Sequence, residues 1–133
     1  MPTISFRYIV DDVDAALAFY RDQLGFTEVM HPAPAFAMLQ LGDLRLLLSA
    51  PNPDGGGGQT LTDGGTPQPG GWNRFTLEVS DLPAEKARLE AAGVRLRSDL
   101  IAGIGGDQLL VEDPSGNLIE LFAPTRDDAR LEG

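Results

Sequence analysis

The chain has 133 residues, 42% of them hydrophobic and 23% charged, which is the usage of one globular domain rather than of a disordered segment. It has no cysteine, which excludes disulfides, thiolate metal sites and cysteine nucleophiles. Its formal net charge of -10 argues against nucleic acid, and it indicates either a cationic ligand or a surface charge that only keeps the protein in solution. No signal peptide and no apolar run of the ~20 residues of a membrane span is found, so we expect a cytoplasmic protein without a membrane partner.

The first part of the chain predicts a strand, a helix and three further strands. Residues 5–10 (SFRYIV) alternate and are rich in β-formers, which is typical of a strand. Asp12 can cap a helix that begins at Val13, and Gly25 can end that helix in the left-handed conformation. Three strands complete a βαβββ unit, the last two joined by a hairpin turn at Gly42-Asp43: residues 26–31, 36–41 and 44–49.

Residues 50–71 then interrupt the pattern with repeated glycines and prolines. A stretch of this length without secondary structure is typical of a lid over a site or of a mobile linker, and both readings remain open. Beyond it the same pattern starts again: a strand over 74–79, a helix from Asp81 to Ala92 that stops at Gly93, an extended segment over 94–100, and hairpin strands over 107–112 and 117–122 around the turn 113–116.

The two units align with each other on their own residues. Three pairs of segments match: 10–13 with 79–82, 24–26 with 92–94, and 46–51 with 119–124. An internal repeat of this extent predicts an α+β fold of two tandem βαβββ modules. The expected boundaries within one domain of residues 1–133 are module one over 4–51, a loop over 52–71, module two over 72–124 and a C-terminal tail over 125–133.

In each predicted sheet one face packs against the helix, and the opposite face is not covered by it. On residues 74–79 the side chains of Phe75, Leu77 and Val79 should meet the helix, which leaves the alternate side chains on the opposite face. That opposite face mixes aromatic, aliphatic and charged residues, as small-molecule pockets do, although a plain solvated sheet face is the alternative. The expected ligand-binding residues, with Trp72 as a stacking group for a planar ligand, are Arg7, Phe36, Met38, Gln40, Leu47, Ser49, Trp72, Arg74, Thr76, Glu78, Leu110, Glu120 and Phe122.

Three segments carry a resemblance to a known family: residues 10–20 (VDDVDAALAFY), 24–26 (LGF) and 113–120 (DPSGNLIE). Together they resemble the vicinal-oxygen-chelate superfamily, which includes glyoxalase I, extradiol dioxygenases, fosfomycin-modifying enzymes and bleomycin-resistance proteins. The resemblance covers about residues 5–124. It implies a homodimer in which paired modules with curved sheets form cups, but it does not choose an activity, because this fold hosts several chemistries.

The resemblance also implies where a metal would be held, on the first and the last strand of each module. These four positions are Ser5, Leu47, Arg74 and Glu120. Only Glu120 is an ordinary ligand, and the single histidine, His31, lies elsewhere, so we expect no metal and no cofactor. A carboxylate-only site of Glu78, Glu112 and Glu120 is the alternative. The positive guanidinium of Arg74 would occupy the place of the metal ion and pair with Glu120. This pair would either orient a ligand or be a purely structural ion pair.

The hypothesis that follows is a metal-free protein of the bleomycin-resistance type. It would sequester an antibiotic or another hydrophobic or cationic compound, aromatic in part, in the cups of a homodimer. The competing hypothesis is an enzyme, either a glyoxalase-like lyase or isomerase or a dioxygenase-related protein, that uses Glu120 as its catalytic base with an atypical or absent metal.

Overall fold

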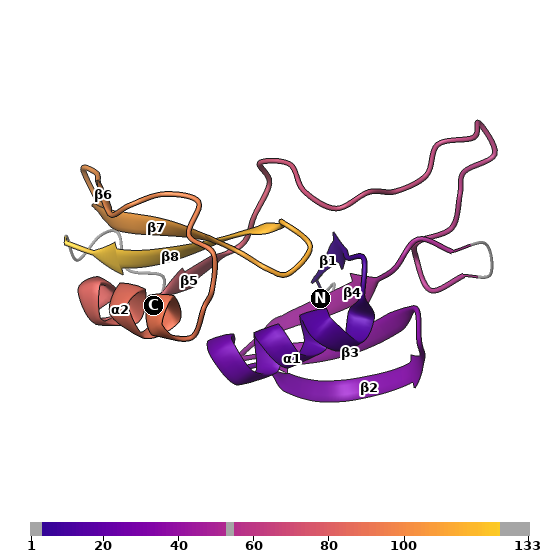
Figure 1. Ribbon diagram of the computed structural model, residues 1–133, viewed down its shortest axis with the longest axis horizontal. Helices are drawn as coiled ribbons and strands as arrows, with labels where there is room; N and C mark the ends of the chain where they lie inside the picture. The colour runs from indigo at the N-terminus through magenta and orange to yellow at the C-terminus, as the bar shows by residue number, and fades with distance from the viewer. Residues whose placement is uncertain (1–3, 53–54, 126–133) are drawn as a thin grey trace. The chain divides into compact units, whose positions relative to one another are not determined.

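The computed structural model of the protein describes residues 4–52 and 55–125. They fall into two compact units, one formed by the residues up to 70 together with 114–117, the other by 71–113 together with the residues from 118 onwards. Each unit contains one helix and one four-stranded sheet of mixed direction (Figure 1). The predicted α+β fold of two βαβββ modules is confirmed.

The first sheet has the strand order β1-β4-β3-β2. β1 runs parallel to β4, whereas the pairs β4–β3 and β3–β2 are antiparallel. The bounds of these strands are Ser5–Ile9 for β1, Thr27–Ala33 for β2, Phe36–Leu41 for β3 and Leu44–Ser49 for β4. β2 forms an edge of the sheet, and its register against β3 shifts twice, between Glu28 and Met30 and between Met30 and Ala33.

Helix α1 (Val13–Leu24) has both of the ends that the sequence predicted. The Asp12 carboxylate accepts a hydrogen bond from the Ala15 N–H at 3.1 Å, and Gly25 adopts a φ of 81° while its N–H bonds to the Tyr20 carbonyl. The helix lies along one face of the sheet, as Figure 1 shows. The core beneath it contains these buried side chains, each contributing about 1.5–3 kcal/mol: Tyr8, Val13, Leu17, Tyr20, Phe26, Leu39, Leu46 and Leu48.

The second sheet repeats this topology with the order β5-β8-β7-β6. The strand bounds are Thr76–Glu78 for β5, Ile101–Ala102 for β6, Gly106–Glu112 for β7 and Leu118–Pro124 for β8. Helix α2 (Leu82–Ala91) is capped by Asp81, whose carboxylate accepts the Ala84 N–H at 3.0 Å. Only Leu82 and Leu89 of this helix are buried, so α2 covers its sheet with much less apolar surface than α1 does.

The segment predicted as extended over 94–100 lies along β7 but does not form a regular strand. It has one isolated bridge, from Leu96 to Val111, and a few backbone hydrogen bonds, and the paired strand β6 begins only at Ile101. The N–H groups of Arg97 and Ser98 both donate to the Leu110 carbonyl, and the Ser98 hydroxyl accepts the Leu110 N–H at 3.0 Å. A side chain therefore takes the hydrogen bond that a regular ladder would have used. The strand predicted over 74–79 is likewise shorter, since β5 spans Thr76–Glu78.

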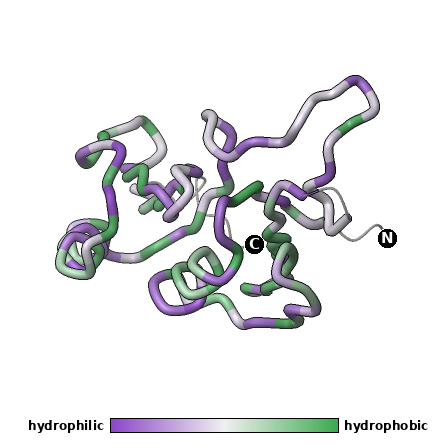
Figure 2. The backbone as a smooth tube through the Cα atoms, turned by 45° about the vertical axis from the view of Figure 1, so that its right-hand side comes forward, coloured by the Kyte–Doolittle hydropathy of each residue, from purple (hydrophilic) through white to green (hydrophobic). Residues whose placement is uncertain are grey.

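The connection between the two units contains no helix or strand in its described part, residues 50–52 and 55–75. Figure 2 shows its long excursion mostly in white and purple, with one short green stretch, so it is largely polar or neutral. Apart from Thr125, the predicted tail over 125–133 lies outside the described residues. No helix within residues 4–52 and 55–125 is long and apolar enough to cross a membrane.

Candidate functional site

The face of the first sheet that is turned away from α1 is called here the first outer face. Three rows of Cα partners across β1, β4 and β3 make up this face: Ser5–Arg45–Gln40, Arg7–Leu47–Met38 and Ile9–Ser49–Phe36. Partners in such rows share a face because side chains alternate along each strand. The structure thus brings together the binding residues predicted for module one. It adds Arg45 and Ile9, which the predicted set did not include.

The second outer face is the corresponding surface of the second sheet. Its rows of Cα partners across β5, β8 and β7 are Thr76–Glu120–Leu110 and Glu78–Phe122–Gln108. These rows bring together the predicted residues of β5, β7 and β8 and add Gln108. The two outer faces differ in charge, because the rows of the first contain arginines and those of the second contain glutamates, one of which, Glu120, pairs with Arg74.

Arg74 and Glu120 form the ion pair that the sequence predicted. Nε and Nη2 of Arg74 donate to the same carboxylate oxygen, Oε1 of Glu120, at 3.1 and 2.9 Å. The guanidinium also donates through Nη1 to the Trp72 carbonyl at 3.2 Å and through Nη2 to Oε1 of Gln108 at 3.4 Å. The side chains are 27% and 16% exposed, so the pair is partly desolvated. Within the described residues Oε2 of Glu120 accepts no hydrogen bond, which leaves it as an acceptor for a ligand.

Trp72 lies beside this pair and offers an aromatic surface. Its side chain is largely exposed, and the Arg97 guanidinium lies 4.8 Å from the ring centroid, a cation–π contact. A tryptophan held in this way presents a rigid plane on which an aromatic ligand can stack. The stacking role of Trp72 stays a prediction, and the contact with Arg97 was not predicted, because it joins two segments that lie far apart in the sequence.

The residues at the four metal-ligand positions do not suit a transition-metal ion. Leu47 has no donor atom, and the positive guanidinium of Arg74 is hydrogen-bonded onto the carboxylate of Glu120. No three histidine, cysteine or acidic side chains come together at a metal-binding distance in the part of the chain that the structure describes, Glu78, Glu112 and Glu120 included. His31 is half-buried rather than exposed, with Nε2 3.4 Å from Oδ1 of Asp14.

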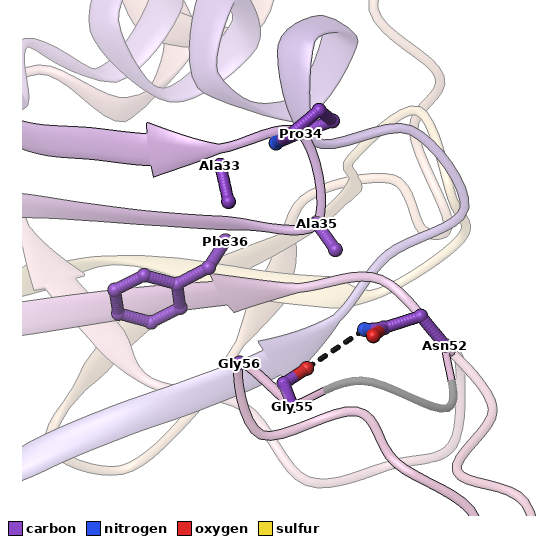
Figure 3. Close-up of a pocket in the computed structure, with 7 residues that line it drawn as sticks. All are labelled: Ala33, Pro34, Ala35, Phe36, Asn52, Gly55 and Gly56. Carbon is purple, nitrogen blue, oxygen red and sulfur yellow. Dashed lines mark hydrogen bonds between the residues drawn. The ribbon is translucent and has the colours of Figure 1, made fainter.

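A short glycine loop, residues 55–58, folds back onto the end of the first sheet. The Ser49 hydroxyl donates to the Gly56 carbonyl at 2.6 Å, and the Asn52 side-chain amide donates to the Gly55 carbonyl at 2.8 Å. A pocket of about 370 Å³ lies between this loop and the β2–β3 turn (Figure 3). Its lining consists of Ala33, Pro34, Ala35, Phe36, Asn52, Gly55 and Gly56. This part of the connection is therefore packed and hydrogen-bonded rather than a free linker.

Close approach requires glycine at position 58, where a Cβ atom would overlap the backbone carbonyl of Ala50, whereas Gly56 and Gly57 lie against side chains. A Cβ atom at Gly56 would lie 3.2 Å from Cβ of Phe36, and a Cβ atom at Gly57 would lie 2.5 Å from Cζ of Arg7. Both residues also have a positive φ, 78° and 90°, which disfavours any other residue. The glycine loop thus touches two of the predicted binding residues, one aromatic and one cationic.

In each unit the first strand runs parallel to the last strand. This strand order agrees with the family that the sequence matches. A family model described as the Glyoxalase/Bleomycin resistance protein/Dioxygenase superfamily matches residues 4–121. The chain belongs to this superfamily. The resemblance of residues 10–20, 24–26 and 113–120 is thereby confirmed.

Solved structures of this superfamily and of similar proteins share the fold. A superfamily member from Sphaerobacter thermophilus DSM 20745 is 25% identical with a TM-score of 0.73, covering 92% of this chain and 97% of that one. A lactoylglutathione lyase from Agrobacterium tumefaciens is 24% identical with a TM-score of 0.70, covering 92% of each chain. TnmS3, an antibiotic-binding protein from Streptomyces sp. CB03234, is 24% identical with a TM-score of 0.70, covering 94% of this chain and 97% of that one. No curated protein sequence matches the chain.

Proposed function

We propose that the chain is a metal-free small-molecule-binding protein of the bleomycin-resistance type, which sequesters an antibiotic or another hydrophobic compound on its outer faces. The Arg74–Glu120 pair carries this proposal. A guanidinium covers the one ordinary ligand among the four metal positions, so a cation would have to displace it. Half-buried side chains such as Phe36, Leu47 and Phe122 supply apolar contact area. The antibiotic-binding protein TnmS3, which has the same fold, suggests which compounds to try first.

We also propose that the protein is a cytoplasmic homodimer. In support, large apolar side chains are exposed in both units: Ile4, Val29, Met30, Leu100, Ile101 and Ile104. Exposed apolar groups of this size often mark protein interfaces, and a two-fold dimer is the commonest way to cover them. Sedimentation velocity at micromolar concentration tests this proposal, and a monomer would contradict it.

A second candidate is an enzyme of the glyoxalase or dioxygenase-related type with Glu120 as its base. One observation favours it. Glu120 is the acidic residue at a predicted metal position, and its Oε2 is left without a hydrogen bond among the described residues while Arg74 and Gln108 fix its surroundings. A base must be able to reach its proton, and an oriented carboxylate with one open oxygen meets that requirement.

A ligand screen separates the two candidates. Purified protein is tested against a library of antibiotics and planar aromatic compounds by thermal shift, because a ligand at 100 times its Kd stabilises the fold by about 2.7 kcal/mol. Each hit is then incubated with the protein and recovered. A compound that is bound and recovered unchanged supports sequestration. A compound that is converted by the wild type, but only bound by Glu120→Gln, supports the enzyme. Stabilisation by no compound, or stoichiometric metal that Glu120→Gln removes, contradicts the first proposal.

A further inference from the structure

The first outer face carries two arginines that have no carboxylate partner among the described residues. Most basic side chains of the described chain do lie within 4.0 Å of a carboxylate: Arg21, Arg74, Lys86, Arg88 and Arg95. Arg97 lies on the Trp72 ring instead. Arg7 and Arg45 differ from all of these, since neither forms an ion pair or a side-chain hydrogen bond within residues 4–52 and 55–125. Both are exposed.

Arg7 and Arg45 are close neighbours on this face. Arg7 is the Cα partner of Leu47 across β1 and β4, and Arg45 precedes Leu47 by two residues on the same side of β4. A strand spacing of ~4.8 Å and a rise of ~3.3 Å per residue place the two Cα atoms about 8 Å apart. Two guanidinium groups at that separation can both reach one bound group.

The charge around the two arginines is positive, although the whole chain is acidic. The described residues that share their rows or the next strand on this face include no acidic side chain: Ser5, Ile9, Thr27, Met30, Ala33, Phe36, Met38, Gln40, Leu47 and Ser49. Charges further away than about 8–10 Å are largely screened at physiological ionic strength. Asp43, in the turn before β4, is an acidic residue two positions from Arg45, and with it counted the two arginines still leave a positive charge on this face, unlike the formal net charge of -10 of the whole chain.

The glycine loop fixes the position of Arg7. A Cβ atom at Gly57 would lie 2.5 Å from Cζ and 2.6 Å from Nε of Arg7, so the guanidinium rests directly against the backbone of the loop. The neighbouring Gly56 lies against Phe36, a wall of the 370 Å³ pocket. A guanidinium held by packing loses less rotamer freedom when it binds than a free one does.

We propose that the first outer face binds the oxyanion of a ligand, a carboxylate or a phosphate, through Arg7 and Arg45. The apolar part of the ligand then lies over Met38, Leu47 and Phe36. Guanidinium groups suit this role because their planar donors match the oxygens of carboxylate and phosphate. The inference rests on the proposed small-molecule-binding function and specifies its ligand, with a charge opposite to that of the cationic compound suggested by the composition.

Four naphthalene probes of the same shape test the proposal by isothermal titration calorimetry: 2-naphthoate, 2-naphthyl phosphate, neutral 2-naphthalenemethanol and cationic 2-naphthylmethylammonium. We expect at least one of the two anions to bind about tenfold more tightly than the neutral probe, because charge-assisted hydrogen bonds are the stronger ones. The anion that binds more tightly shows whether the natural group is a carboxylate or a phosphate. The preference should shrink in 0.5 M salt (~4 Å Debye length).

Variants assign the effect to the two arginines. Arg7→Gln and Arg45→Gln should each weaken anion binding by about fivefold to tenfold and leave the neutral probe unchanged, while Arg7→Lys retains part of the affinity. Arg21→Gln is the matched control, because Arg21 pairs with Asp22 on α1, and it should change nothing. Unfolding curves confirm that each variant is folded.

Two results would overturn the inference and leave small-molecule binding intact: equal affinity for the neutral and anionic probes, or unchanged anion binding in both glutamine variants. Preference for the cationic probe would also overturn it. Binding of none of the four probes at millimolar concentration overturns it as well. The library screen then decides independently whether the proposed function fails too.

Discussion

The side-chain amide of Asn117 donates a 2.8 Å hydrogen bond to the carbonyl oxygen of Ile9, 108 residues away in the sequence. Its Oδ1 accepts the N–H of Gly70, also at 2.8 Å, and the residue is only 3% exposed. One side chain thus satisfies backbone groups at the end of β1 and in the long connection. For this reason the turn over residues 114–117 belongs to the first unit, although it joins two strands of the second sheet.

Replacing Asn117 by alanine should therefore destabilise the protein. Asn117→Ala removes the partner of the half-buried Ile9 carbonyl and of the N–H of the exposed Gly70, so we expect a loss of about 1 kcal/mol in the free energy of unfolding, measured by urea denaturation. Asn73→Ala is the control, because Asn73 is exposed, and it should stay within about 0.5 kcal/mol of the wild type. Equal stability of the two variants would contradict this role of Asn117.

The Arg74–Glu120 pair should be measurably coupled. The two side chains are more buried than a surface pair but not fully enclosed, so a double-mutant cycle of Arg74→Ala and Glu120→Ala should give a coupling energy of about 1–2 kcal/mol. The exposed pair Arg21–Asp22 serves as the comparison and should give a clearly smaller coupling energy, because solvent screens it. Arg74→Ala should also weaken ligand binding by more than it weakens the fold. Full ligand affinity in folded Arg74→Ala would show that the pair is only structural.

Gly57 and Gly64 allow the effect of close approach to be separated from that of backbone conformation. Both have a positive φ, 90° and 88°, but a Cβ atom would meet the Arg7 guanidinium at Gly57 and nothing within 4 Å at Gly64. Each alanine substitution should cost about 1 kcal/mol or more for the φ value alone. Gly57→Ala should in addition displace Arg7, seen as a shift of the Arg7 Nε–Hε resonance in NMR spectra. An unchanged Arg7 resonance would contradict the contact.

The ion pair between Lys86 and Asp99 should make a pH-dependent contribution. The Lys86 ammonium, 3.0 Å from the Asp99 carboxylate, holds the pKa of Asp99 below its ordinary value, and the Leu100 N–H adds to this effect. A lowered folded-state pKa gives stability that is present above the unfolded value of ~3.9 and is lost as the pH falls through the folded value. The small stability difference between the wild type and Asp99→Asn should be present at pH 7 and fade below about pH 4. A difference that grows in acid would contradict this.

What could be predicted from the sequence was mostly local. Asp12 and Gly25 fixed both ends of α1 because caps depend on neighbouring backbone groups, and alternation placed Arg7, Leu47 and Thr76 on the correct faces. The features that were missed depend on residues far apart in the chain. The Ser98 hydroxyl accepts the Leu110 N–H in place of a backbone carbonyl. Neither this bond nor the contact of Arg97 with Trp72 can be inferred from the local sequence.

The glycine loop was missed for a similar reason. A run of glycines has the same composition whether it is free or packed, and only the approach of Gly58 to the Ala50 backbone shows that a side chain is excluded there. Lid and linker were therefore indistinguishable in the sequence. In the structure residues 55–58 are held by Ser49 and Asn52, which argues against a free linker at this point.

The irregular register of β2 has a consequence for the behaviour of the protein at high concentration. β2 is an edge strand that exposes Val29 and Met30, a combination that invites another chain to add a strand and start aggregation. Its two register shifts, the second of which contains Pro32, break the row of backbone donors and acceptors that an incoming strand would need. Further copies of the chain are thereby hindered from extending the sheet, a process that has no natural end.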